Sequence, residues 1–166
     1  MKQQRTTFAL ILASMITILT ARTGSGAVQD TGRPTYVIAF IPLAWEGSRA
    51  AFESAAHSHG ELFVSESGIS AYADVEIRLL EDALDAALDD AWLVHDVVRF
   101  GLVREPADRY VGLTDQDLAP LDDISVAGWT FGPDSLGAVV EDHKAMITAH
   151  ELGHTFGLCD EYLYSE

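Results

Sequence analysis

The side chains best suited to catalysis lie near the C-terminus, in the stretch AHELGHTFGLCDEY at residues 149–162. His150 and His154 are four residues apart, so on a helix both project from one face and can reach a single metal ion. Glu151 follows the first histidine and can extend into the space beside the metal. There its carboxylate can take a proton from a metal-bound water, whose pKa Zn²⁺ lowers toward roughly 7. The spacing therefore predicts zinc-dependent activation of water.

A third ligand is needed, because catalytic zinc sites use three protein ligands and keep a fourth position open. Gly157 can adopt a left-handed conformation that ends the helix, so the chain can turn back under the metal. We expect Asp160, three residues further on, to be the third ligand; a plain turn residue is the alternative. Glu161 is the alternative ligand. Cys159, the only cysteine, would overfill an open site as a thiolate, so we expect it to be structural or unpaired.

The stretch HELGHTFGLCD resembles the pattern His-Glu-x-x-His-x-x-Gly-x-x-His/Asp of the metzincin clan of zinc metallopeptidases. The aspartate in third place is similar to that of snapalysin-type small neutral proteases. The resemblance implies that His150, His154 and Asp160 bind Zn²⁺ and that Glu151 is the catalytic base. It also implies a twisted sheet whose edge strand precedes the zinc helix and pairs with extended peptide substrate. Residues 135–142 are in about the right place for this edge strand.

One feature of the metzincin pattern is missing from this chain. Metzincins carry a methionine-containing turn downstream of the third ligand, which forms a floor beneath the metal. Only EYLYSE follows Asp160, and Met1, Met15 and Met146 all precede the motif. We therefore expect a truncated piece of a longer peptidase, in which Cys159 has lost a downstream disulfide partner; a variant without the turn is the alternative.

The elements that would position this motif alternate along the chain. Apolar and alternating stretches predict strands at residues 35–45, 73–81, 109–115, 124–131 and 135–142. Helical spacing predicts helices after a Ser48 cap, over residues 82–103, and around the motif. The last helix would be capped by Asp142, with a core stripe of Met146, Ala149, Leu152 and Phe156. Together with the resemblance, this order predicts an α+β fold, α/β-like in its element order, with a zincin-type twisted mixed sheet packed on helices and the HExxH helix at the C-terminal end.

The remaining histidines divide by their surroundings. His59 and His95 fall on apolar helical stripes, where we expect buried, hydrogen-bonded histidines rather than metal ligands. His57 and His143 are expected to face solvent.

The N-terminus has the three regions of a secretory signal peptide. Lys2 and Arg5 precede an apolar run over residues 8–19, and small residues follow. The run falls short of the about 20 apolar residues of a membrane span. We expect cleavage after Ala27, with Ala21 as the alternative site and an uncleaved anchor as the alternative role.

The mature chain would then have a loose start at residues 28–34 and a single domain over residues 35–166, secreted from the cell. The whole chain has 26 acidic and 10 basic residues, a formal net charge of −16. This charge repels nucleic acid and anionic membranes, so we expect a peptide or protein substrate, no nucleic acid and no stable membrane association after signal cleavage. The acidic excess also suits a halophilic source.

The sequence thus predicts an exported zinc endopeptidase that hydrolyses peptide bonds by Glu-assisted attack of a zinc-bound water. The alternative is a non-catalytic protein, either a truncated relic or an extracellular zinc-binding module. A gluzincin-type peptidase is disfavoured, because its glutamate ligand would need a later helix than the chain provides.

Overall fold

The computed structural model describes residues 32–81, 83–84, 105–118, 125–130 and 132–158. Its strands are β1 (Thr35–Pro42), β2 (Asp74–Leu79), β3 (Arg109–Thr114), β4 (Gly128–Thr130) and β5 (Gly137–Glu141). Its helices are α2 (Arg49–Ser67) and α4 (Ala145–Thr155), with 3₁₀ turns η1 (Ile69–Ala71) and η2 (Gly132–Asp134). The predicted class is confirmed: the fold is mixed α/β, with a five-stranded mixed sheet and packed helices.

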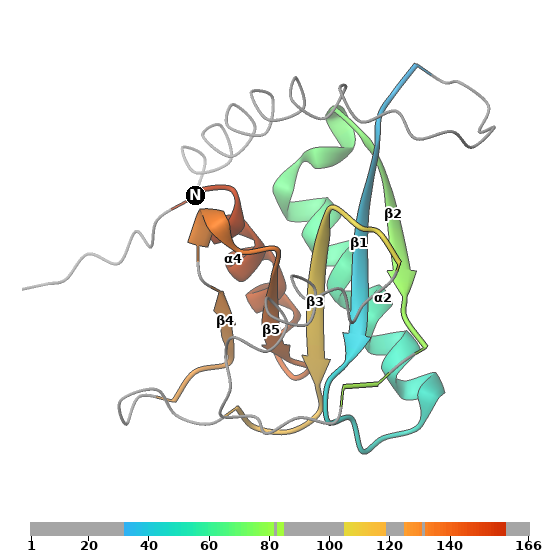
Figure 1. Ribbon diagram of the computed structural model, residues 1–166, viewed down its shortest axis with the longest axis vertical. Helices are drawn as coiled ribbons and strands as arrows, with labels where there is room; N and C mark the ends of the chain where they lie inside the picture. The colour runs from blue at the N-terminus through green and yellow to red at the C-terminus, as the bar shows by residue number, and fades with distance from the viewer. Residues whose placement is uncertain (1–31, 82, 85–104, 119–124, 131, 159–166) are drawn as a thin grey trace, which may run out of the picture.

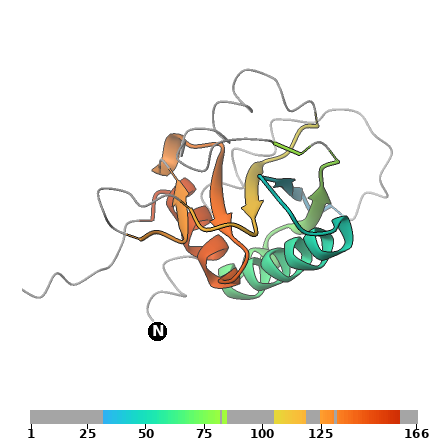
Figure 2. The same ribbon diagram turned by 90° about the horizontal axis from the view of Figure 1, so that it is seen from below.

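The strands form one sheet in the order β2-β1-β3-β5-β4 (Figure 1). In this order β2, β1, β3 and β5 are parallel to one another, and β4 pairs antiparallel with β5. Both α2 and α4 lie on the same face of this sheet (Figure 2). The main core fills the space between that face and the two helices. Its buried strand residues alternate along the chain, as a strand requires: Ile38, Phe40, Val111, Leu113, Ala138 and Val140.

Helix α2 has local signals at both ends. The Ser48 side chain accepts a hydrogen bond from the Ala51 amide at 3.2 Å, which confirms the predicted cap. Gly68 ends the helix in the left-handed region, with a φ of 69°. Between them, the aromatic side chains of Phe52 and Phe63 are buried against the sheet. The capped, amphipathic segment therefore forms where the sequence placed it.

The edge of the sheet differs from the prediction. Residues 135–142 were expected to form the edge strand, but β5 pairs on both sides, with β3 and with β4. The edge strand is β4 instead. β4 pairs antiparallel with β5, with Trp129 opposite Val139. It therefore covers the side of β5 that was expected to be free.

The start of the helix that carries the motif also differs. Asp142 was predicted to cap it, but α4 begins at Ala145 after Lys144, without a side-chain cap. The amide of Asp142 still donates to the Thr114 carbonyl at 2.8 Å, so this residue belongs to the end of the sheet. Met146 was predicted in the core stripe, yet it is 56% exposed. It lies one turn before His150 on the same side of the helix, whereas Leu152 faces the core.

Several predictions fall outside or largely outside the described residues. The signal peptide over residues 1–27 and its cleavage site lie there, as does most of the helix predicted over 82–103. The one described residue of that segment with defined pairing, Leu84, forms a parallel bridge with Leu43 rather than helix. Within the described part of the chain, no helix combines the length and the apolar character that crossing a membrane requires.

Candidate metal centre

The helix that carries the motif packs tightly against the edge strand. On β4, Gly128 lies so close to α4 that an added Cβ would overlap Cγ2 of Ile147 and come within 2.8 Å of Cγ of Glu151. A glycine at this position therefore permits the close approach of strand and helix. The same contact holds the Glu151 side chain, which is 10% exposed, between β4 and the helix.

The two motif histidines meet as the helical spacing predicts. Nε2 of His150 lies 3.2 Å from Nε2 of His154, with the ring planes at 83°. Two nitrogens that bind one tetrahedral zinc at 2.0–2.1 Å are separated by about 3.3 Å. The pair thus has the donor type and spacing that zinc requires, and His150 and His154 are the residues that would hold it.

The second histidine is oriented by the backbone that follows the helix. Nδ1 of His154 lies 2.7 Å from the carbonyl oxygen of Leu158. A carbonyl can only accept, so Nδ1 carries the hydrogen and Nε2 is left as the nitrogen with a lone pair. Gly157 makes this possible. Its φ of 81° confirms the predicted left-handed conformation and turns the chain back.

Glu151 is next to this pair but belongs to a different environment. Its Oε1 lies 4.0 Å from Nε2 of His150, and the residue as a whole is 7% exposed. His150 and His154 are more accessible than Glu151. A carboxylate in this position, largely shielded from solvent, is suited to accept a proton from a group bound at the histidines.

The other predicted ligands lie beyond the described residues. Asp160, Glu161 and Cys159 all follow Leu158, the last described residue, so their roles stay predictions. The structure therefore brings together His150, Glu151 and His154.

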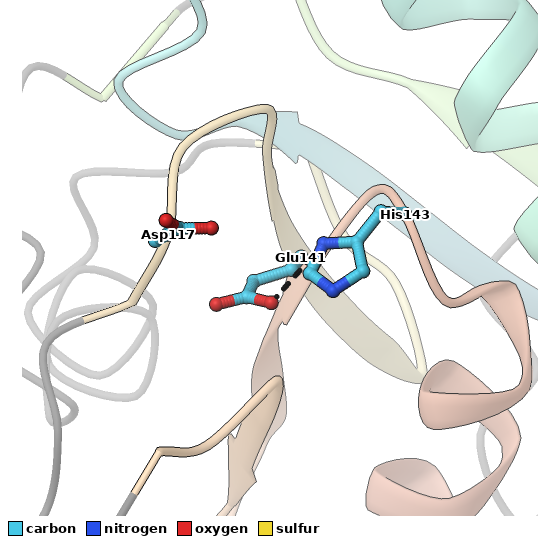
Figure 3. A group of neighbouring side chains, drawn as sticks. All are labelled: Asp117, Glu141 and His143. Atoms are coloured by element: carbon cyan, nitrogen blue, oxygen red, sulfur yellow. Dashed lines mark ion pairs between the residues drawn. The ribbon is translucent and has the colours of Figure 1, made fainter.

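A second group of ligand-type side chains was not predicted from the sequence. Asp117, Glu141 and His143 place one ligand atom each within 4.8 Å of one another (Figure 3). Oε1 of Glu141 accepts a hydrogen bond from the Leu118 amide at 2.7 Å, and its Oε2 lies 3.2 Å from Nδ1 of His143. These donor types could hold a divalent cation, but each oxygen of the buried Glu141 carboxylate already has a partner within the protein, so its burial needs no bound ion.

The remaining histidines are found largely as expected. His59 is 1% exposed and hydrogen-bonded through both ring nitrogens, which confirms its predicted burial. His57 and His143 are exposed, as predicted, although His143 also pairs with Glu141. His95 lies outside the described residues.

Sequence reasoning missed Gly128 and the partners of α4, because each acts on a residue far along the chain. The available signal was indirect: Thr148 and Thr155 are seven residues apart, so two polar side chains recur on the buried face of the helix.

The chain thus combines a five-stranded mixed sheet and packed helices with a histidine pair on α4. The chain is similar in fold to archaemetzincin from Methanopyrus kandleri, with a TM-score of 0.55 and 21% sequence identity over 81% of each chain. A second structure, metalloproteinase-II from Bacteroides fragilis, has a TM-score of 0.48 and 16% identity, over 77% of this chain and 43% of that one. No protein-family model and no curated protein matches the sequence.

Proposed function

We propose that the protein is a zinc-dependent endopeptidase. The observation that carries this proposal is the 3.2 Å separation of the two Nε2 atoms of His150 and His154, with Glu151 beside them. The fold similarity to archaemetzincin supports it. We propose Asp160 as the third ligand.

The chemistry divides between the metal and this chain's residues. A bound Zn²⁺ would supply a Lewis acid that polarises the scissile carbonyl and acidifies water. His150 and His154 would hold it, and the Leu158 carbonyl keeps His154 in the tautomer that can bind. Glu151 accepts the proton of the attacking water and returns it to the leaving amine.

The substrate would be an extended peptide bound along the edge of the sheet. Among the described strands, β4 is the edge next to α4, and one side of it is already paired with β5. A peptide that added a strand to the other side would pass close to Glu151, since Gly128 touches that side chain. We further propose that the protein is exported, on the strength of the signal-peptide pattern in its first 27 residues.

Three variants and two control variants test these roles. His150→Ala should abolish zinc binding, whereas His57→Ala, which removes an exposed histidine of α2, should not. Glu151→Gln should keep the zinc and lower peptidase turnover by roughly 10²–10⁴-fold, because it removes the proton acceptor. Asp160→Ala should weaken zinc binding more than Glu161→Ala does.

Zinc content and hydrolysis of an unfolded protein substrate are the measurements. Unchanged zinc in His150→Ala, or parent-like turnover in Glu151→Gln, would contradict the proposal. A parent chain that binds zinc and cleaves nothing would instead support a non-catalytic zinc-binding module.

A further inference from the structure

Two buried threonines of α4 form hydrogen bonds with a histidine and an arginine from two other elements of the fold. Thr148 and Thr155 are seven residues apart on one face of the helix, and both are 0% exposed. His59 of α2 contacts the first, and Arg109 of β3 contacts the second. We call these two sets of hydrogen bonds the helix clamp.

The first half of the clamp uses both nitrogens of His59. Nε2 lies 3.0 Å from the Asp142 carbonyl oxygen, which can only accept, so Nε2 carries the hydrogen. Nδ1 lies 2.7 Å from Oγ1 of Thr148 and therefore accepts from its hydroxyl. One buried ring thus fixes the turn before α4 and the first half of α4 itself.

The second half uses the guanidinium group of Arg109. Nε donates to Oγ1 of Thr155 at 2.8 Å, and Nη2 donates to the Thr155 carbonyl at 3.2 Å. The Thr155 hydroxyl in turn donates to the Leu152 carbonyl at 2.7 Å. The same guanidinium lies 5.1 Å from the centroid of the Phe156 ring. The cation therefore sits at the C-terminal end of the helix, where the helix dipole favours it.

The helix clamp fixes the rotation of α4 about its own axis, which apolar packing alone leaves undetermined. α4 has 11 residues, a length at which a helix depends on tertiary contacts, and its described core contacts include Leu152 and Phe156. Apolar contacts are non-directional, so they tolerate small rotations of the helix about its axis, whereas hydrogen bonds require defined directions. Two fixed points on one face set the rotation and thereby the direction of His150 and His154.

We propose that His59 and Arg109 are positioning residues that set the rotation of α4 and so the geometry of the metal-binding histidines. This inference rests on the proposed function, since it gives the clamp a purpose in zinc binding. His59 and Arg109 lie outside the motif, on α2 and β3.

The test removes one hydroxyl at a time without changing the shape of the side chain. Thr148→Val removes the hydrogen bond to His59, and Thr155→Val removes the bond from Nε of Arg109 to the hydroxyl while leaving the bond to the Thr155 carbonyl. Thr148→Ser and Thr155→Ser retain all of these bonds. Loss of a group that directly orients a ligating histidine costs about 10–100-fold in metal affinity. The two threonines orient the helix rather than a ligating histidine directly, so the loss should be smaller. We expect zinc affinity to fall roughly threefold to tenfold in the valine variants, with a changed Co²⁺ absorption spectrum. The serine variants should match the parent in both.

Ile69→Val is the control for an effect of lower stability alone. It removes one methyl group from the same core at η1, away from α4. It should lower the denaturation midpoint and leave the zinc affinity and the Co²⁺ spectrum unchanged. Valine variants that bind zinc like the parent with an unaltered spectrum would overturn the inference, as would the same changes in Ile69→Val.

Failure of the proposed function has a different signature, a parent chain that binds no zinc. In that case hydrogen exchange of the α4 amides decides whether the clamp sets the helix. Faster exchange in the valine than in the serine variants would uphold it, and equal exchange would overturn it.

Discussion

At the residue scale, one backbone carbonyl decides which nitrogen of His154 can bind a metal. The Leu158 carbonyl reaches Nδ1 because the chain reverses at Gly157. Two hydrogen bonds close this reversal: the Gly157 amide donates to the His154 carbonyl at 2.9 Å, and the Leu158 amide donates to that of Gly153 at 3.2 Å. This is the Schellman arrangement, in which the left-handed residue satisfies carbonyls at the helix end.

Gly157→Ala tests the dependence of the metal site on this reversal. A Cβ at a φ of 81° costs about 1–2 kcal/mol, and relief of that strain would move the Leu158 carbonyl away from Nδ1. We expect weaker zinc binding in a chelator competition. Gly157→Asn is the matched control, since asparagine tolerates left-handed conformations better. Equal zinc affinity in the two variants would contradict this role of Gly157.

At the element scale, the packing of β4 on α4 depends on Gly128. An added methyl group would overlap Ile147 and crowd Glu151, so Gly128→Ala should cost roughly 1–3 kcal/mol of stability. Peptidase turnover should fall as well, because Glu151 must move. Adding Ile147→Ala makes room for the methyl group and should recover part of the stability without restoring turnover. Urea denaturation and peptidase assays of the single and double variants check this; independent, additive effects would contradict the overlap.

The contact between α2 and α4 should make stability depend on pH. Burial lowers the pKa of His59, although the Asp142 carbonyl, and its carboxylate at 3.5 Å, favour the charged form. In the unfolded chain a histidine titrates near 6.5, so as pH falls the unfolded state binds this proton before the folded state does. The stabilisation is therefore complete above about pH 6.5 and is lost as the pH falls below it.

Urea denaturation at pH 7 and pH 5 measures this effect. The drop in unfolding free energy between the two should be smaller in His59→Gln than in the parent. His57→Gln removes an exposed histidine from the same helix and should show the parent's drop. A drop in His59→Gln equal to that of the parent would show that His59 does not titrate on unfolding.

The sequence predicted those features of the elements that have local causes. Ser48 caps α2 through an amide three residues away, and Gly157 ends α4 by its own backbone conformation. Asp142 failed as a cap, because its amide bonds to the Thr114 carbonyl directly after β5 and α4 begins three residues later, at Ala145. The edge strand was also misplaced because of long-range contacts. Pairing of β5 with β3 and β4 depends on the sequences of those strands, and the sequence of β5 alone does not reveal it.

At the scale of the whole molecule, the site is built where separate parts of the fold meet. The motif itself could be recognised within residues 150–160, but its support comes from β4, α2 and β3 through Gly128, His59 and Arg109. Gly128 and Arg109 have ordinary local surroundings in the sequence, and for His59 the sequence predicted burial but not its partner on α4. Their roles follow only from a sheet order that brings distant segments against α4.

The net charge of −16 should make the stability of the whole molecule depend on salt. Folding concentrates this charge, and the resulting repulsion opposes the compact state. Salt screens that repulsion, but it also weakens exposed ion pairs such as Arg49–Glu53 and Arg78–Glu76. Such pairs contribute only about 0–1 kcal/mol each, so the relief of repulsion should decide the sign.

We therefore expect the midpoint of thermal unfolding to rise with NaCl concentration. Most of the rise should occur below about 0.5 M, since the screening length has already fallen to about 3 Å at 1 M. A rise that continues linearly at higher concentration would instead indicate exclusion of the salt from the protein surface, which sucrose would reproduce without screening. A midpoint that is unchanged by NaCl, in refolding as in unfolding, would contradict both the repulsion argument and the halophilic origin that the acidic composition suggested.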